Sequence, residues 1–199
     1  VDTDVDTFKK TNLRTAGGHI HLGSEVLMDG HVNYHHAIRL LDLFLGTVSI
    51  FVDHDSTSRR RKAIYGKSGR YRTTSYGVEY RTPGNFWLAS PKLVGLIYDI
   101  CEFTINFIES GKVNNFWKID IEKLSSREAW ADHNFHPSQC HTCHGYSIVG
   151  LRNAIDTMDK QSGQQFLDFV QSYFPKKING AIEELKEDKE YDLYSEWGL

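Results

Sequence analysis

The chain has 199 residues, enough for one sizeable domain with its own hydrophobic core. Its composition, with 40% hydrophobic, 13% aromatic and 25% charged residues, is that of a globular protein and excludes collagen-like, low-complexity and wholly disordered chains. A formal net charge of -3 excludes a general attraction to nucleic acid or anionic membranes, so phosphate binding needs a local basic patch.

The N-terminal quarter predicts a strand followed by a helix. Residues 1–10 suit an edge strand or an extended arm equally well. In the segment GGHIHLG, His19 and His21 lie on one face of a predicted strand and apolar residues lie on the other. Apolar residues then recur at three- and four-residue steps over 34–52, which predicts a helix packed on the sheet. Charged and small residues interrupt this stretch, so we expect no membrane span.

A second strand is predicted near the middle of the chain. Residues 53–74 have no periodicity and many Ser, Thr, Gly and Arg residues, which predicts a long loop, and such loops are usually functional. The segment SYGVEYR then alternates again and places Glu79 and Arg81 on one face of a strand that Pro83 ends. Three further helices are predicted, at 91–110, 147–160 and 163–188.

These elements predict one α+β domain over residues 1–199, with a curved, mainly antiparallel sheet backed by helices. Within it, residues 12–110 form the core, 112–146 an irregular segment rich in His and Cys, and 147–199 the C-terminal helices.

The two predicted strands carry the strongest chemical signal. His19 and His21 share a face on one strand, and Glu79 and Arg81 share a face on the other. Imidazole and carboxylate are suitable ligands for Mg²⁺ or Mn²⁺, and a guanidinium beside them binds a carboxylate or phosphate. The combination indicates phosphoryl chemistry; the alternative is that these are only the solvated faces of a sheet.

The predicted loop between the strands is strongly basic. Gly66 and Gly69 would let its backbone approach a phosphate, and its cations would stabilise a transferring phosphoryl group, so ATP is a fitting ligand. One alternative is that the segment is only a solvated loop. Nucleic acid, which the interleaved tyrosines would suit, is a less favoured partner. The basic residues are Arg59, Arg60, Arg61, Lys62, Lys67, Arg70 and Arg72.

A separate cysteine motif lies in the irregular segment. Cys140, Cys143 and His144 form a CxxCH pattern, which is typical of covalent haem attachment and also suits a structural zinc ion with a nearby histidine. A polar loop with a reduced thiol pair is the third interpretation. Three cysteines give no disulfide framework, so we expect a reducing compartment, the cytoplasm.

Three segments in this order, RTAGGHIHLG, RRRKAIYGKSGRYR and YGVEYRTPGNFWL, resemble the phage-type carboxylate–amine (COOH–NH2) ligases of the glutamine synthetase superfamily. The resemblance covers about residues 12–110 and implies the catalytic core of that superfamily, with ATP and Mg²⁺ or Mn²⁺. It implies a metal site at His19 and Glu79, nucleotide binding by His21, Arg59, Arg61 and Lys67, and catalytic roles for Arg81, which grips the substrate carboxylate, and for Arg70 and Arg72.

The implied reaction joins a small-molecule or peptide carboxylate to an amine through an acyl phosphate, in a bacterial or phage-infected cell. The family also places metal-binding glutamates on a strand upstream of the HxH segment, and Asp2, Asp4 and Asp6 do not match them. A second chain could supply these acids. The alternatives are an incomplete or truncated site, a non-catalytic binding or assembly module that keeps the ligase fold, or a small zinc or haem protein organised by CxxCH.

Overall fold

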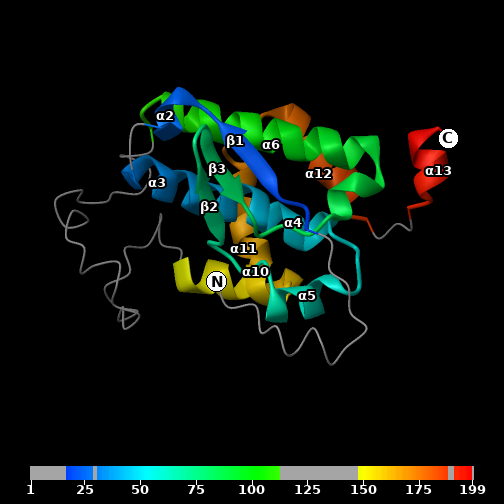
Figure 1. Ribbon diagram of the computed structural model, residues 1–199. Helices are drawn as coiled ribbons and strands as arrows, with labels where there is room; N and C mark the ends of the chain where they lie inside the picture. Colours follow the sequence, from blue (N-terminus) through cyan, green and yellow to red (C-terminus); the bar gives the residue numbers. More distant parts are fainter. Residues whose placement is uncertain (1–16, 29–30, 113–147, 188–190, 199) are drawn as a thin grey trace.

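The protein has the α+β fold that the sequence predicts (Figure 1). A computed structural model describes residues 17–28, 31–112, 148–187 and 191–198. One small antiparallel sheet lies against a body of helices, and in the view of Figure 1 the sheet is in front.

The sheet has the strand order β1-β3-β2, with β1 at Ile20–Gly23, β2 at Tyr71–Thr74 and β3 at Gly77–Tyr80. Gly77 starts β3 with φ +150°, and a Cβ atom there would lie 2.0 Å from the carbonyl oxygen of Leu22 on the paired strand. Only glycine fits this close approach, so this residue fixes where the two strands meet.

The predicted loop over residues 53–74 is only partly a loop. It contains a helix, α5 at Ser58–Ile64, and strand β2. The residues that α5 buries are Ser58, Arg61 and Lys62, so its inward stripe is polar and a search for apolar periodicity misses it. Strand β2 is short and largely exposed, and its order comes from pairing with β3.

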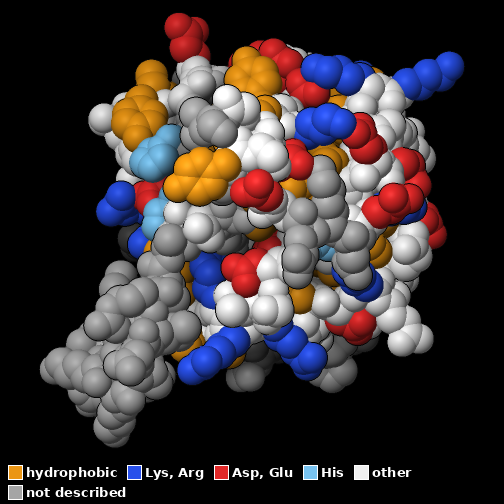
Figure 2. Space-filling model, turned by 90° about the vertical axis from the view of Figure 1, so that its right-hand side faces the viewer, with side chains coloured by type: hydrophobic (Ala, Val, Ile, Leu, Met, Phe, Trp, Pro, Cys, Tyr) orange, Lys and Arg blue, Asp and Glu red, His pale blue; other side chains and the backbone are white. Residues whose placement is uncertain are grey.

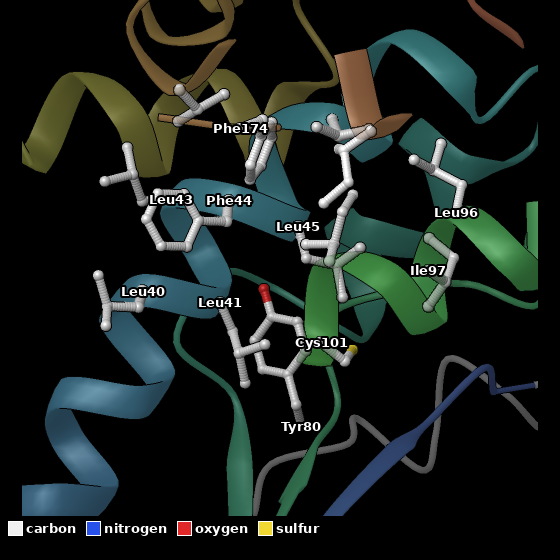
Figure 3. Packing of buried hydrophobic residues seen from close by; sticks show 14 of the residues in the cluster. Leu40, Leu41, Leu43, Phe44, Leu45, Tyr80, Leu96, Ile97, Cys101 and Phe174 are labelled. Carbon is white, nitrogen blue, oxygen red and sulfur yellow. The ribbon is translucent and has the colours of Figure 1, made fainter. Parts of the chain in front are cut away.

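The core is built around the predicted helix over residues 34–52, which forms as α3 (His31–Leu41), a π-helical turn (Asp42–Gly46) and α4 (Thr47–Val52). By length and composition alone the stretch Tyr34–Val52 could cross a membrane, but 89% of it is buried inside the fold, as in the core helix of a globular protein. Figure 3 shows Tyr80 of β3 reaching into this core between Leu41 and Cys101.

The remaining helices enclose the core. A short α2 (Glu25–Met28) follows β1, a 3-10 turn (Phe86–Ala89) follows β3, and α6 (Pro91–Glu109) starts at a Ser90 cap. The C-terminal segment adds α10 (Ile148–Thr157), α11 (Lys160–Gln171), α12 (Lys176–Leu185) and α13 (Leu193–Trp197). α10 and α11 pack on α4, and α12 packs on α6.

One predicted helix is interrupted. The expected helix over 163–188 breaks between α11 and α12, because Pro175 has no backbone N–H and its extended conformation caps the start of α12. At the start of α11, Gly163 lies where a Cβ atom would be 3.1 Å from Ile50, so the missing side chain lets this helix approach α4 closely.

Candidate active site

Side chains of the three strands gather on the sheet face that is turned away from the core. In the register of the sheet, Glu79 of β3 lies opposite His21 of β1 and opposite Arg72 of β2. Antiparallel partners point to the same face, and so do residues two positions along a strand. Six residues singled out in the sequence therefore come together: His19, His21, Arg70, Arg72, Glu79 and Arg81.

Glu79 is the centre of this group. Its side chain is only 2% exposed, and its carboxylate lies 2.7 Å from Nδ1 of His19, 2.6 Å from Nε of Arg72 and 3.6 Å from Nε of Arg81. Burial raises the pKa of Glu79, but the charge and hydrogen bond of Arg72, together with the charge of Arg81, outweigh burial and hold the pKa below its ordinary value. The site therefore contains a carboxylate that is ionised at neutral pH.

His19 is neutral in this environment. Burial lowers its pKa and the charges of Arg81 and Arg61 add to the effect, while Glu79 opposes it. With Nδ1–H donating to Glu79, the unprotonated Nε2 accepts from the hydroxyl of Tyr65 at 3.2 Å. A neutral imidazole is the form that binds a metal ion, which at Nε2 would take the place of the Tyr65 hydroxyl.

The position of His19 depends on the two glycines before it. The backbone of Gly18 passes directly against Gly84, so that a Cβ atom on Gly18 would lie 1.7 Å from the carbonyl oxygen of Gly84. Gly17 and Gly84 form a bridge, and Trp87 donates from its indole to the carbonyl of Gly18 at 3.3 Å. The GG and PG pairs of the two motifs thus fix one another beside the site.

Tyr65 is part of the site, and the sequence analysis did not assign it a role there. Its ring lies 5.2 Å from the guanidinium carbon of Arg81 and 5.6 Å from that of Arg61, both within cation–π range. Its hydroxyl contacts His19. The signal in the sequence is a tyrosine that stands three residues after Lys62, the end of the basic run.

His21 lies beside Glu79 on the same face and is exposed. Its Nδ1 is 2.6 Å from the hydroxyl of Tyr76, which sits in the turn between β2 and β3. Figure 2 shows histidine side chains on the surface at the left-hand edge of the molecule, next to basic, acidic and hydrophobic side chains. Because His21 and Arg72 are both exposed, a ligand could reach the group from outside.

The predicted nucleotide-binding cations separate into two sets. Arg61 is buried and donates to the carbonyls of Thr82 at 3.1 Å and Pro83 at 2.8 Å, so its guanidinium holds the chain that follows β3. The exposed Arg59 lies near Asp159, whose pKa is lowered first by a bond from Ser162 and further by the charge of Arg59. The exposed Lys67 lies in the loop before β2.

Lys62, a second cation of the predicted basic loop, is also buried and supports the same chain segment. Lys62 donates to the carbonyls of Gly66 at 3.3 Å and Thr82 at 3.2 Å, and burial lowers its pKa to about 8. Arg61 and Lys62 thus bind protein carbonyls, which is why they are inside although the run they belong to is strongly basic.

The structure corrects the expectation that the glycine-containing loop offers its backbone to a phosphate. The amide of Ser68 donates to the carboxylate of Asp156 at 2.6 Å, and the amide of Gly69 donates to that of Asp42 at 3.0 Å. These two amides are already bound to anions of the protein itself. The cationic side chains of the loop can therefore bind a ligand, whereas its backbone amides at these two positions cannot.

No group of three or more His, Cys, Asp or Glu side chains is arranged to hold a metal ion among the residues that the structure describes. His19 and Glu79 provide two donors. That number suits Mg²⁺ or Mn²⁺ that arrives with phosphate groups, because such ions keep several waters and phosphate oxygens and need few protein ligands. Cys140, Cys143 and His144, the predicted zinc or haem ligands, lie outside the described residues.

Comparison with known proteins gives one match. The family model described as "Phage phiEco32-like COOH.NH2 ligase-type 2" matches residues 10–124, more than half of the chain. These residues include all three strands, α5 and α6. No curated protein and no solved structure matches the chain.

Proposed function

The chain belongs to the phage phiEco32-like COOH.NH2 ligases of type 2, and from this premise we propose that it uses ATP and a divalent cation to join a carboxylate to an amine. One observation of the site supports the proposal most directly. An ionised, buried Glu79 and a neutral His19 lie together on a sheet face that also carries Arg72 and Arg81. His19 and Glu79 are suitable ligands for a divalent metal ion, and the two arginines beside them suit anionic substrates.

His19 and Glu79 would hold Mg²⁺ or Mn²⁺, which when bound neutralises charge on the triphosphate of ATP. His19 reaches this role through the tautomer that Glu79 and Tyr65 impose, with its lone pair on Nε2. The charges of Arg72 and Arg81 keep Glu79 ionised for this role.

Arg81 would bind the carboxylate of the substrate. Its side chain is 28% exposed and is held from two directions, by the carboxylate of Glu79 and by the ring of Tyr65. A guanidinium fixed in this way can bind a carboxylate with two parallel hydrogen bonds without first becoming ordered. It thereby orients the oxygen that attacks the phosphate.

Arg70 and Arg72 lie on the same face and are more exposed, with 63% of the Arg72 side chain in solvent. Their charges would stabilise the γ-phosphoryl group as it transfers. Lys67, Arg59 and His21 would contact the nucleotide, whereas Arg61 would act indirectly, because its guanidinium already binds Thr82 and Pro83.

In the first step, an oxygen of the substrate carboxylate bonds to the γ-phosphorus and the bond from that phosphorus to the β-phosphate oxygen breaks, which gives an acyl phosphate and ADP. In the second step, the nitrogen of the amine bonds to the acyl carbon and the bond from carbon to the phosphate oxygen breaks. The products are an amide, inorganic phosphate and a proton that passes to solvent. The protein's residues orient the reactants and stabilise charge.

Acidic side chains from a second chain would complete the cation site, since the described residues offer it only two ligands. The reaction would take place in the cytoplasm of the bacterial host. ADP release by this chain that appears only after the product of a neighbouring gene is added would support the two-chain form, and full activity of the chain alone would exclude it.

The test is ADP release by the full chain with ATP, Mg²⁺ and a panel of amino acids, short peptides and amines. Glu79→Gln should lower turnover by about 100-fold or more, because it removes a charge at the reacting centre. Glu183→Gln on α12 is the matched control, an exposed carboxylate paired with Lys186, and should leave turnover unchanged. A fluorescence-monitored melt would show that both variants fold.

Binding of ATP alone gives a second measurement, by equilibrium dialysis with and without Mg²⁺. Mg²⁺-dependent binding that Glu79→Gln weakens and Glu183→Gln does not would support the proposed site. A folded chain that neither binds ATP nor releases ADP, alone or with its neighbour's product, would refute the proposal and favour a non-catalytic assembly module with the same fold.

A further inference from the structure

The loop over residues 65–70, which joins α5 to β2, is fixed to the protein at almost every residue. The carbonyl of Gly66 accepts from Lys62, and the carbonyl of Lys67 accepts from the hydroxyl of Thr82 at 3.0 Å. At its end, the carbonyl of Arg70 accepts from the amide of Arg81 at 2.9 Å. The loop therefore sets where the side chains of Lys67 and Arg70 leave the backbone, next to Arg81 and Thr82 at the end of β3.

The two amides in the middle of this loop, those of Ser68 and Gly69, each donate to a carboxylate. Bonds from an amide to an ionised acceptor are stronger than bonds between neutral groups. The carboxylates come from two elements that are far apart in sequence but pack on each other, Asp42 from the π-helical turn and Asp156 from α10. Together they hold the loop against the place where the π-helical turn and α10 meet.

Asp42 also connects the loop to the central strand. The same oxygen that accepts from Gly69 accepts from the hydroxyl of Tyr80 at 2.7 Å. Tyr80 is the neighbour of Glu79 in β3, and its side chain is wholly buried on the other face of the sheet. One buried carboxylate thus fixes the loop relative to the strand that carries Glu79.

Asp156 contributes from a part of the chain that lies beyond the matched residues 10–124. One turn earlier on the same helix, Nε of Arg152 donates to the hydroxyl of Ser68 at 3.3 Å. α10 therefore holds Ser68 by both its amide and its side chain. The loop also contains or adjoins three exposed cations, Lys67, Arg70 and Arg72.

We propose that Asp42 and Asp156 are positioning residues that hold the loop over residues 65–70 in the shape that places Lys67 and Arg70 at the candidate active site. The role in catalysis rests on the proposed function. The role in shaping the loop does not, because it concerns only bonds within the chain.

Asp156 is the better residue to change, since it lies partly exposed at the end of α10 and its removal leaves the core intact. The test compares Asp156→Ala and Asp156→Asn with wild type in the full chain. Asp168→Ala is the matched control, an exposed aspartate on α11 that accepts a hydrogen bond from Gln164 of the same helix. Asp42→Asn, which keeps the acceptor oxygen, adds a second and milder perturbation.

The first readout is hydrogen exchange of the backbone amides of Ser68 and Gly69, followed by NMR. Asp156→Ala should speed exchange at these two amides by about tenfold or more, the equivalent of one charge-assisted hydrogen bond. Asp156→Asn should fall between Asp156→Ala and wild type, and Asp168→Ala should match wild type. Unchanged exchange in Asp156→Ala would overturn the proposal.

The second readout is the kinetics of ADP release. Asp156→Ala should raise the KM for ATP by about tenfold with a smaller change in kcat, because misplaced cations weaken ATP binding. A variant that is only partly folded would instead lose kcat at constant KM, and that result would overturn the positioning role. If wild type neither binds ATP nor turns over, the proposed function fails, and the exchange measurement alone decides the inference.

Discussion

The carboxyl group of Asp42 should make the stability of the protein depend on pH in a direction opposite to that of most acidic residues. Burial raises its pKa from the ordinary 3.8 to about 6, although bonds from Gly69 and Tyr80 and the charges of Lys62 and Arg152 oppose the rise. The native protein therefore keeps a proton on Asp42 at pH values where the unfolded chain has lost it.

The size of the effect follows from the gap between the two pKa values. Below pH 3.8 the group is protonated in both states. As the pH rises through about 6, the native carboxyl must ionise inside the fold. Each unit between the two pKa values corresponds to about 1.4 kcal/mol. The free energy of unfolding therefore falls by about 3 kcal/mol relative to that of a protein in which this residue does not titrate. Stability contributed by this group is thus present in acid and lost toward neutrality.

Asp42→Asn isolates this contribution, because asparagine has nearly the same shape and still offers an oxygen to Gly69 and Tyr80. We expect the unfolding free energy of wild type minus that of Asp42→Asn to fall by about 3 kcal/mol between pH 3.5 and pH 7. Urea titrations followed by tryptophan fluorescence at half-unit pH steps measure it. Asp168→Asn, the same substitution at an exposed aspartate of α11, is the control. A flat difference for Asp42→Asn, or one that rises with pH, would refute the reasoning.

Three further predictions concern the fold. Gly77→Ala should destabilise the protein by about 2 kcal/mol or more, measured by urea unfolding, because its Cβ would collide with the Leu22 carbonyl. Phe44→Ala should cost about 3–5 kcal/mol in the same assay, since that ring packs edge-on against two other phenylalanine rings. Cys101, whose pKa burial raises to about 12, should resist alkylation in the native protein and react after unfolding, as followed by peptide mass mapping.

The sequence predicted the sheet face because a period of two leaves a clear mark. In both HIH and VEYR, polar residues with useful chemistry alternate with apolar ones, and the register of the sheet brings His21 opposite Glu79. The helix over 34–52 was predictable for a similar reason, since its apolar stripe is continuous. In these segments the local pattern and the tertiary environment agree, so the local pattern was sufficient.

The supports of the site were not predictable, because they depend on buried polar groups that meet over long distances in sequence. Asp42 reads in the sequence as an interruption of an apolar helix, and nothing near it indicates that its partner is the amide of Gly69, 27 residues later. The Ser68 amide meets Asp156 across 88 residues. No periodicity encodes such pairs, since each side chain looks solvated until the fold is known.

The basic residues between positions 59 and 72 have two different roles, because the chain changes from a helix to a strand along them. From 58 to 64 the chain is a helix, and its spacing of three and four residues turns Arg61 and Lys62 inward to the carbonyls that follow β3. From 71 the chain is a strand, and its spacing of two turns Arg72 to the face of Glu79. Charge counting along the run therefore overstates the cations available to a ligand. The switch from helix to strand, which the loop over residues 65–70 makes, decides which cations support the protein and which face the substrate.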